Sequence, residues 1–356
     1  MSTATRVRSD ADPTAMRSAR TLPSWAPWGL LVGLLALAAA LWALGAVGPV
    51  LAVVLALVIY AIALPLWSRA VEGPRRALDR LVTVLVTGAF VVALVPLVSV
   101  AWTVIENGVT RFDTQFFTWS MRGVVGEGGG AYHAILGTVI VTLLATAISV
   151  PIGLMTAVYL TEYGRGRLAG AVTFLVDVMT GIPSIVAGLF AYALFALIFG
   201  PGVRLGIMGA IALSVLMIPV VVRSSEEMLR LVPHDLREAA YALGVPKWLT
   251  IVKVVLRTAV GGLATGVTLA MARVIGETAP LLVTLGTTTG TNLNPFEGRM
   301  ATLPVFSFYS YTQPGVPPEF SQDRAWTAAL LLIIIVMVLN LVARLIARVF
   351  APKVGR

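Results

Sequence analysis

Two arginine–carboxylate pairs stand in or beside long apolar segments of this sequence, where charged side chains are rare. Arg223 and Glu226 are three residues apart, and Arg273 and Glu277 are four apart. A charge inside a membrane span costs about 2.5–3.5 kcal/mol on insertion scales, so such a residue usually faces a pore or a partner protein. The planar guanidinium group can donate two hydrogen bonds to an oxyanion, and a neighbouring carboxylate keeps it from holding that anion permanently. We therefore predict that these four residues line a path for an oxyanion.

Each pair also has a structural interpretation, which the sequence leaves open. Arg223 and Glu226 would then form an ion pair at the membrane surface, and Arg273 and Glu277 would link helices, because residues four apart share one helix face. Asp177, inside another apolar segment, has the same two interpretations. Gly181 and Pro183 follow it, and the proline predicts a break or kink because it removes a backbone donor. That break is either a gate hinge or a bend that fits neighbouring helices.

The segments that position these residues are long and apolar. Of the 356 residues, 58% are hydrophobic and 12% are charged, whereas about a quarter of the residues in soluble domains are charged. An apolar run of about 20 residues crosses the hydrocarbon core as a helix. We therefore predict an all-α polytopic membrane protein with about eight transmembrane helices, at residues 28–47, 50–67, 81–105, 134–161, 168–200, 205–222, 257–278 and 325–343.

The basic residues predict the orientation of these spans. With the N-terminus placed inside, 20 of the 26 lysines and arginines fall in inner segments, five fall in outer segments, and Arg273 lies within a span. Positive charge favours the cytoplasmic side, so both termini are expected in the cytoplasm of a bacterial plasma membrane. The charge is spread over five inner segments rather than gathered on one surface, which argues against a nucleic-acid partner.

The sequence holds little that suggests an enzyme. There is no cysteine, and the only histidines, His133 and His234, fall in different predicted compartments. None of the three lysines is a Gly-Lys followed by Ser or Thr, the combination by which a P-loop holds phosphates and magnesium. We predict a non-catalytic chain with no metal site and no cofactor of its own.

The long inner segment at residues 223–256 is not a simple linker. It predicts short amphipathic helices separated by turns, with Asp235 in the first turn of one helix and Gly244 at its end. Short helices with small residues on one side fit a groove on a partner protein. The residues Glu238, Ala239, Ala240 and Gly244 resemble the EAA loop of ABC-importer permeases, although Arg257 stands where many such loops have proline. The resemblance implies docking to a cytoplasmic ATPase, which would bind the ATP and magnesium.

Three further segments extend the resemblance to one family. REAAYALGVPK at residues 237–247, RVIGETAPLL at 273–282 and GIPSIVAGLF at 181–190 are similar to PstA permeases of bacterial phosphate importers, as is the tail NLVARLIARVF. The likeness covers residues 81–356 and implies a type I ABC-importer permease core, in which Arg223, Arg273 and Glu226 serve phosphate passage. It also implies three partners: a PstC-type permease, a PstB-type ATPase dimer and an extracytoplasmic phosphate-binding protein.

The usual PstA pattern has six spans, so the first two spans here form an extra N-terminal helical hairpin. Adding two spans returns the chain to the same side and preserves the topology of the rest. The expected domains are a polar cytoplasmic tail, the extra hairpin with a basic inner loop, the permease transmembrane domain with its coupling loop at 223–256, and a basic C-terminal tail, at residues 1–26, 27–80, 81–350 and 351–356 respectively.

Two other functions stay open at this point. One is a permease for another oxyanion, such as sulfate or molybdate. The other is an ion-coupled secondary carrier without an ATPase, which would be expected to bury more ionisable residues in its spans and to contain an inverted repeat. A purely structural membrane protein would not explain the organised inner loop.

Overall fold

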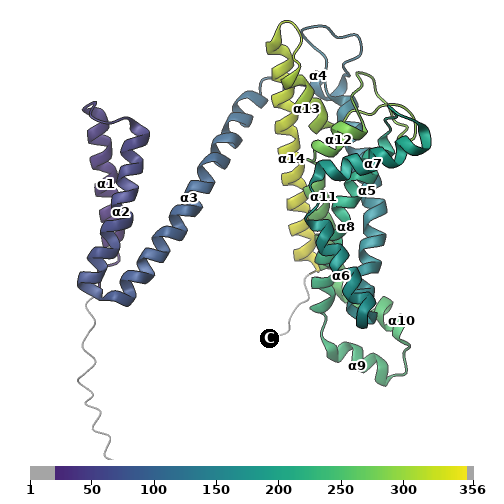
Figure 1. Cartoon of the computed structure of the whole chain (residues 1–356), viewed down its shortest axis with the longest axis horizontal. Helices are drawn as coiled ribbons and strands as arrows, with labels where there is room; N and C mark the ends of the chain where they lie inside the picture. Colours follow the sequence, from purple (N-terminus) through teal and green to yellow (C-terminus); the bar gives the residue numbers. More distant parts are fainter. Residues whose placement is uncertain (1–20, 351–356) are drawn as a thin grey trace, which may run out of the picture. The chain divides into compact units, whose positions relative to one another are not determined.

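The computed structural model describes residues 21–350, which form helices and connecting loops without a β-strand (Figure 1). Most of the predicted N-terminal tail and all of the predicted tail at 351–356 lie outside the described residues. The helices are, in chain order, α1 (Ala26–Ala43), α2 (Pro49–Glu72), α3 (Pro74–Gly108), α4 (Thr114–Thr118), α5 (Tyr132–Val158), η2 (Tyr159–Tyr163), α6 (Gly166–Thr180), α7 (Ser184–Phe199), α8 (Gly206–Arg230), α9 (His234–Ala242), α10 (Lys247–Thr250), η3 (Ile251–Val255), α11 (Leu256–Val274), α12 (Ala279–Thr284), α13 (Leu303–Thr312) and α14 (Pro318–Phe350).

The predicted all-α polytopic fold is confirmed. Among the described residues, seven helices are long and apolar enough to span a membrane, and the bent pair α6–α7 raises the number to as many as eight. Several helices are longer than the apolar runs that predict them. A helix can continue beyond the hydrocarbon region because its charged side chains there reach water. The span expected at 325–343 is part of α14, and the one expected at 257–278 runs instead over Lys247–Val274.

The described residues fall into two compact units that divide within α3, between Val100 and Ala101. In the first unit, α1 and α2 pack against each other through Ala38, Ala52 and Ala56. Small side chains at such a contact allow two helices to approach closely where the surrounding solvent is lipid. The extra N-terminal hairpin is therefore a packed helix pair, while its boundary at residue 80 stays a prediction.

A hydrogen-bonded cluster holds the end of this hairpin. The carboxylate of Glu72 accepts hydrogen bonds from Ser68 at 2.7 Å, from the backbone N–H of Leu22 at 2.8 Å, and from Arg80 Nε at 2.7 Å. The Glu72 side chain is only 2% exposed. The turn from α2 into α3 passes through Gly73 at φ 94°, a conformation that glycine adopts without strain. This one carboxylate thus joins α2, α3 and the chain entering α1.

In the second unit, α8 is the central helix. It packs against α5, α6, α7, α11 and α12, and 61% of its apolar stretch is buried, against 17% for α14. A Cβ placed on Gly153 of α5 would lie 2.7 Å from Val221 of α8, so this helix pair is too close for any larger residue there.

Glycines also set the approach of α11 to α8. A Cβ on Gly262 would overlap Met228, and one on Gly266 would lie 2.8 Å from the Ser224 hydroxyl oxygen. Gly262 and Gly266 therefore let α11 pack closely against α8. Because the numbers rise along α11 as they fall along α8, the two helices run antiparallel.

The predicted break in the fifth apolar segment is confirmed as well. The segment is two helices, α6 and α7, which meet at 107° across Gly181–Pro183. Pro183 precedes the first residue of α7, where a missing backbone N–H is harmless. Figure 1 shows α7 lying across the bundle near α12, and a Cβ on Gly188 of α7 would lie 2.6 Å from Pro280 Cα.

Candidate functional site

The first predicted pair, Arg223 and Glu226, belongs to a larger ionic network at one end of α8. Arg223 Nη1 donates to Glu226 Oε2 at 2.9 Å, and Arg223 Nη2 bonds Asp177 Oδ1 on α6. The other Glu226 oxygen accepts a hydrogen bond from Arg230. Two arginines thus meet two carboxylates, and the formal charges of the network cancel.

The two carboxylates differ in how firmly they are held. The Glu226 side chain is 7% exposed, whereas the Asp177 side chain is 57% exposed. A buried carboxylate that loses its partner is strongly destabilising, while an exposed ion pair contributes little. Glu226 is therefore the buried partner of Arg223, and Asp177 is the partner that solvent reaches. The sequence singled out Asp177 but offered no way to connect it to Arg223, 46 positions later.

The second predicted pair is not formed, and the expected helical spacing is wrong. α11 ends at Val274, so Arg273 occupies its last turn while Glu277 lies in the following turn. Among the ion pairs of the described residues, none joins Arg273 to Glu277. Gly276 between them explains the end of the helix, since glycine favours a helix terminus. Arg273 is exposed on the surface of this chain, and Glu277 is half-buried.

The two arginines lie at different depths rather than in one site. The contacts of Gly262 with Met228 and of Gly266 with Ser224 set the register of the antiparallel α8 and α11. In that register Arg273 is level with Met217, about 9 Å along the α8 axis from Arg223 at 1.5 Å per residue.

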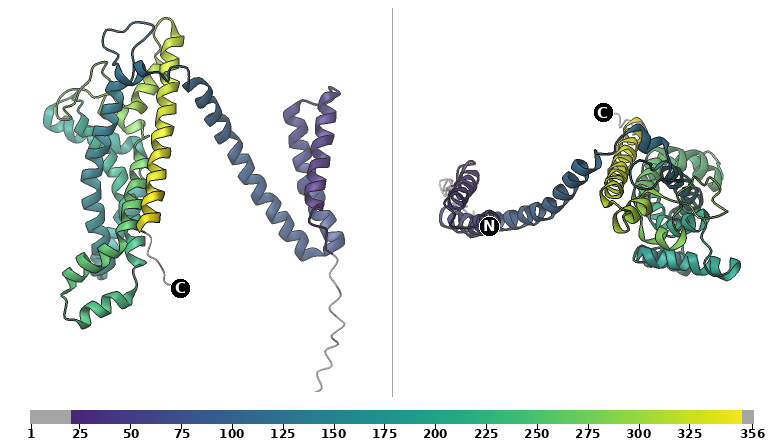
Figure 2. Two further views of the ribbon diagram at one scale, coloured as in Figure 1. Left: turned by 180° about the vertical axis from the view of Figure 1, so that it is seen from behind. Right: turned by 90° about the horizontal axis from the view of Figure 1, so that it is seen from above.

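The inner loop folds only in part as the sequence predicts, because residues 223–230 continue α8 and residues 247–255 lead directly into α11. α9 spans His234–Ala242 with Asp235 in its first turn. Gly244 follows at φ 74°, the left-handed conformation in which glycine commonly ends a helix. Pro246 then precedes α10, and the loop projects beyond the end of the helical bundle in Figure 2.

Arg237 attaches α9 to the rest of the second unit. Its Nη2 lies 2.8 Å from Glu162 Oε1 in η2, and it also donates to the backbone carbonyls of Leu229 and Val232. The side chains of Arg237 and Glu162 are only 12% and 6% exposed. Lys247 at the start of α10 bonds the Glu162 backbone carbonyl too. Sequence reasoning missed Glu162, because nothing local relates it to a residue 75 positions away.

The opposite side of this loop is left uncovered. Of the four residues of the EAA motif, Ala240 is buried, whereas Glu238, Ala239 and Gly244 are exposed. Large apolar side chains accompany them, with Leu243 83% exposed and Trp248 62% exposed. Small residues beside exposed apolar side chains form a surface that suits insertion into a groove of another protein.

Known proteins resemble the chain over most of its length. Residues 149–356 match the family described as "Binding-protein-dependent transport system inner membrane component". The chain is 48% identical over 287 residues to "Phosphate transport system permease protein PstA 1" of Mycobacterium tuberculosis strain CDC 1551 / Oshkosh, covering 79% of this chain and 92% of that protein. It is 38% identical over 291 residues to "Phosphate transport system permease protein PstA" of Yersinia pestis, covering 80% and 94%.

A solved structure also resembles it. The chain aligns with "Inward facing conformations of the MetNI methionine ABC transporter" at a TM-score of 0.47 and 21% identity, covering 62% of this chain and 94% of that one.

Proposed function

The chain belongs to the PstA family of phosphate transport permeases, and from this we propose that it moves phosphate between arginines at successive depths, driven by an ATPase on another polypeptide. It is a non-catalytic permease subunit of a phosphate ABC transporter and a multi-pass protein of the bacterial inner membrane.

The observation that supports the path most directly is the network around Arg223. Asp177 and Glu226 occupy the donors of this guanidinium group that an oxyanion would use. A phosphate oxygen can take the place of a carboxylate oxygen, because both accept charge-assisted hydrogen bonds. Phosphate would displace Asp177, the exposed partner, and leave Glu226 bound. Arg223 is thereby kept from holding phosphate permanently.

Arg273 would bind the same anion nearer the outer end of the bundle than Arg223 does. It is exposed on this chain and pairs with no carboxylate among residues 21–350. A lipid-facing arginine would be costly, so the exposed side is expected to face a second permease subunit across the path. This arrangement supports a dimer of the present chain with a PstC-type permease.

The break between α6 and α7 would allow the contact between Asp177 and Arg223 to open and close. Asp177 lies on α6, three residues before the helix ends at Thr180, and Gly181 and Pro183 separate it from α7. A rotation of α6 about this break would withdraw Asp177 from Arg223. In this proposal Gly181 and Pro183 are the hinge, and the Asp177–Arg223 contact closes in one state and opens in the other.

The energy of ATP hydrolysis would reach this chain through α9. The exposed Glu238, Ala239 and Gly244 would dock on a PstB-type ATPase dimer, which binds the ATP and magnesium. Arg237 and Glu162 would pass the displacement of α9 to η2 and α5, because a buried ion pair resists separation. An extracytoplasmic phosphate-binding protein would deliver the anion to the opposite side, with both termini of this chain in the cytoplasm.

Phosphate uptake into proteoliposomes that contain the assembled importer tests the proposal. We expect Arg223→Gln to abolish uptake while ATPase assembly is retained, and Glu238→Ala with Gly244→Leu to separate ATP hydrolysis from uptake. Lys253→Ala, an exposed change on the same loop, is the matched control. Normal ATP-coupled uptake by the Arg223→Gln importer would refute the path, and normal coupling by the α9 variant would refute the docking role.

A further inference from the structure

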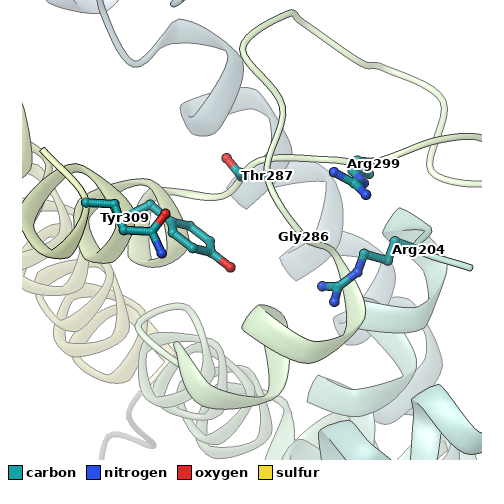
Figure 3. A pocket seen from close by; sticks show the side chains of 6 residues that line it. Arg204, Gly286, Thr287, Arg299 and Tyr309 are labelled. Atoms are coloured by element: carbon teal, nitrogen blue, oxygen red, sulfur yellow. The ribbon is translucent and has the colours of Figure 1, made fainter. Parts of the chain in front are cut away.

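A second cationic site lies at the end of α8 opposite the coupling loop. It is a pocket of about 280 Å³ with six lining residues, Arg204, Gly286, Thr287, Arg299, Tyr309 and Gln313 (Figure 3). Arg204 stands just before α8, and Tyr309 belongs to α13. Arg204 and Arg299 both fall in predicted outer segments, and no local pattern relates them because 95 positions separate them in the chain.

The arginines of this pocket lack acidic partners. No carboxylate among the described residues forms an ion pair with Arg204 or Arg299, although seven ion pairs join other residues there. Arg204 is half-buried and donates Nη1 to the Leu282 carbonyl at 2.8 Å, which fixes its position and leaves other donors free. Two guanidinium groups in one pocket repel each other, so a bound anion would stabilise both.

The other lining groups add donors rather than negative charge. In Figure 3 the Tyr309 hydroxyl and the Arg204 guanidinium group point toward one another across the gap, and Arg299 approaches from the side. Thr287 and Gln313 contribute a hydroxyl and an amide. The tyrosine hydroxyl and the two guanidinium groups approach from different sides, and donors arranged in this way suit a tetrahedral oxyanion, which accepts hydrogen bonds on every oxygen.

Gly286 makes room for the first arginine. Its φ is 68°, and a Cβ there would lie 2.9 Å from Arg204 Cδ and 3.4 Å from Arg299 Cδ. Any larger residue would therefore be strained and would push the Arg204 side chain. Glycine at position 286 therefore adopts this backbone conformation without strain and leaves space for the Arg204 side chain.

The pocket is separate from the Arg223 network. From Gly206 to Arg223 the axis of α8 rises about 26 Å, so the two sites lie near opposite ends of one helix. We propose that the Arg204–Arg299 pocket is an oxyanion site at the outer end of the permease, where inorganic phosphate binds before it moves to Arg273. The inference rests on the phosphate function proposed above, but it concerns binding at a different place and is measured without transport.

The test is phosphate binding to the importer in lipid nanodiscs, assembled from its permease and ATPase subunits without the extracytoplasmic binding protein, which itself binds phosphate. Arg223→Gln and Arg273→Gln together serve as the background, so that the deeper arginines are removed. We expect phosphate still to bind this background. Adding Arg204→Gln or Arg299→Gln should weaken binding about ten-fold each, as expected for one charge-assisted hydrogen bond. Arg122→Gln, an exposed outer arginine outside the pocket, should change nothing.

Three results would overturn the proposal. The first is a background that binds no phosphate, and the second is unchanged affinity after both pocket arginines are replaced. The third is that the pocket variants no longer bind the extracytoplasmic binding protein when it is added, while their phosphate affinity is unchanged. That result would make the pocket a docking site for an acidic side chain of the binding protein. Size exclusion establishes assembly of each variant. If the glutamine variants fail to assemble, Arg204→Lys with Arg299→Lys keeps the charge, and it should weaken phosphate binding because lysine cannot donate a bidentate fork.

These outcomes are distinct from a failure of the proposed function. Uptake by Arg223→Gln tests the deeper path, whereas binding to the double-glutamine background tests the outer pocket. An importer whose Arg223 proves dispensable for uptake could still bind phosphate at Arg204 and Arg299, and the converse also holds.

Discussion

Arg237 Nη2 lies 2.8 Å from Glu162 Oε1, and this ion pair links α9 to η2, the continuation of α5, across 75 positions in the chain. The two side chains are 12% and 6% exposed, so water screens the pair poorly. A contact of this kind transmits displacement between the two elements because its separation leaves two charges without partners.

Removal of either Arg237 or Glu162 should weaken the coupling of ATP hydrolysis to phosphate uptake. Breaking a buried pair by removing one side costs about 3–5 kcal/mol. We therefore expect Arg237→Ala or Glu162→Gln to lower the thermal stability of the chain and the phosphate carried per ATP hydrolysed. Lys253→Ala should leave both measurements at the wild-type level. The exchange Glu162→Arg with Arg237→Glu should restore part of the loss, and a double-mutant cycle that shows no coupling energy would contradict the role of the pair.

The two carboxylates on Arg223 should respond unequally to neutralisation. Asp177→Asn removes an exposed partner, whose ion pair contributes about 0.2–1 kcal/mol, so stability should change little and phosphate should bind slightly more tightly. Glu226→Gln leaves Arg223 and Arg230 without their buried carboxylate and should destabilise the chain markedly. Thermal unfolding together with phosphate titration checks both. Equal effects of the two changes would show that exposure does not separate their roles.

Two glycines around the α6–α7 break distinguish packing from hinge action. At Gly188 a Cβ would lie 2.6 Å from Pro280 Cα and 2.9 Å from its carbonyl oxygen, so Gly188→Ala should force α7 away from α12 and reduce stability. At Gly181 the nearest atom to such a Cβ is 3.5 Å away, so Gly181→Ala should fold normally. A well-folded Gly181→Ala importer with slowed uptake would support a hinge. Wild-type uptake would show that the break serves packing alone.

The outer segment that contains α4 should loosen in acid. Burial alone would raise the pKa of Asp113, but hydrogen bonds from the Phe116 backbone N–H and from Arg111 together hold it below its ordinary value. A lowered carboxyl pKa stabilises the folded form above the unfolded pKa of about 4, and that contribution disappears as pH falls through the folded value. The protection factor of the Phe116 amide against hydrogen exchange, which is the rate of an unfolded peptide at the same pH divided by the rate of the amide, should therefore fall below pH of about 4. Asp113→Asn, which keeps the cap but cannot titrate, should remove the pH dependence.

Much of the site was accessible from sequence because it rests on local patterns. The helix at α9 follows from the acidic first turn and from Gly244, which tolerates the left-handed backbone at φ 74°. The break at Gly181–Pro183 follows from the missing backbone donor of proline. Arg223 and Glu226 pair as predicted, since residues three apart on a helix are neighbours. The same rule failed for Arg273 and Glu277, because it assumes a helix that in fact ends at Val274.

Hydropathy, charge asymmetry and short-range spacing thus identified the bilayer as the solvent of this chain, its helical class and the inner loop, since each depends on residues close in sequence. The attachment of Arg237 to Glu162, the contact of Asp177 with Arg223 and the meeting of Arg204 with Arg299 depend instead on how helices pack. The register of that packing is set by glycines such as Gly266, where the absence of a side chain lets α11 approach Ser224 on α8. No local pattern encodes which distant helix will fill such a space, so these long-range pairs emerge when the bundle closes.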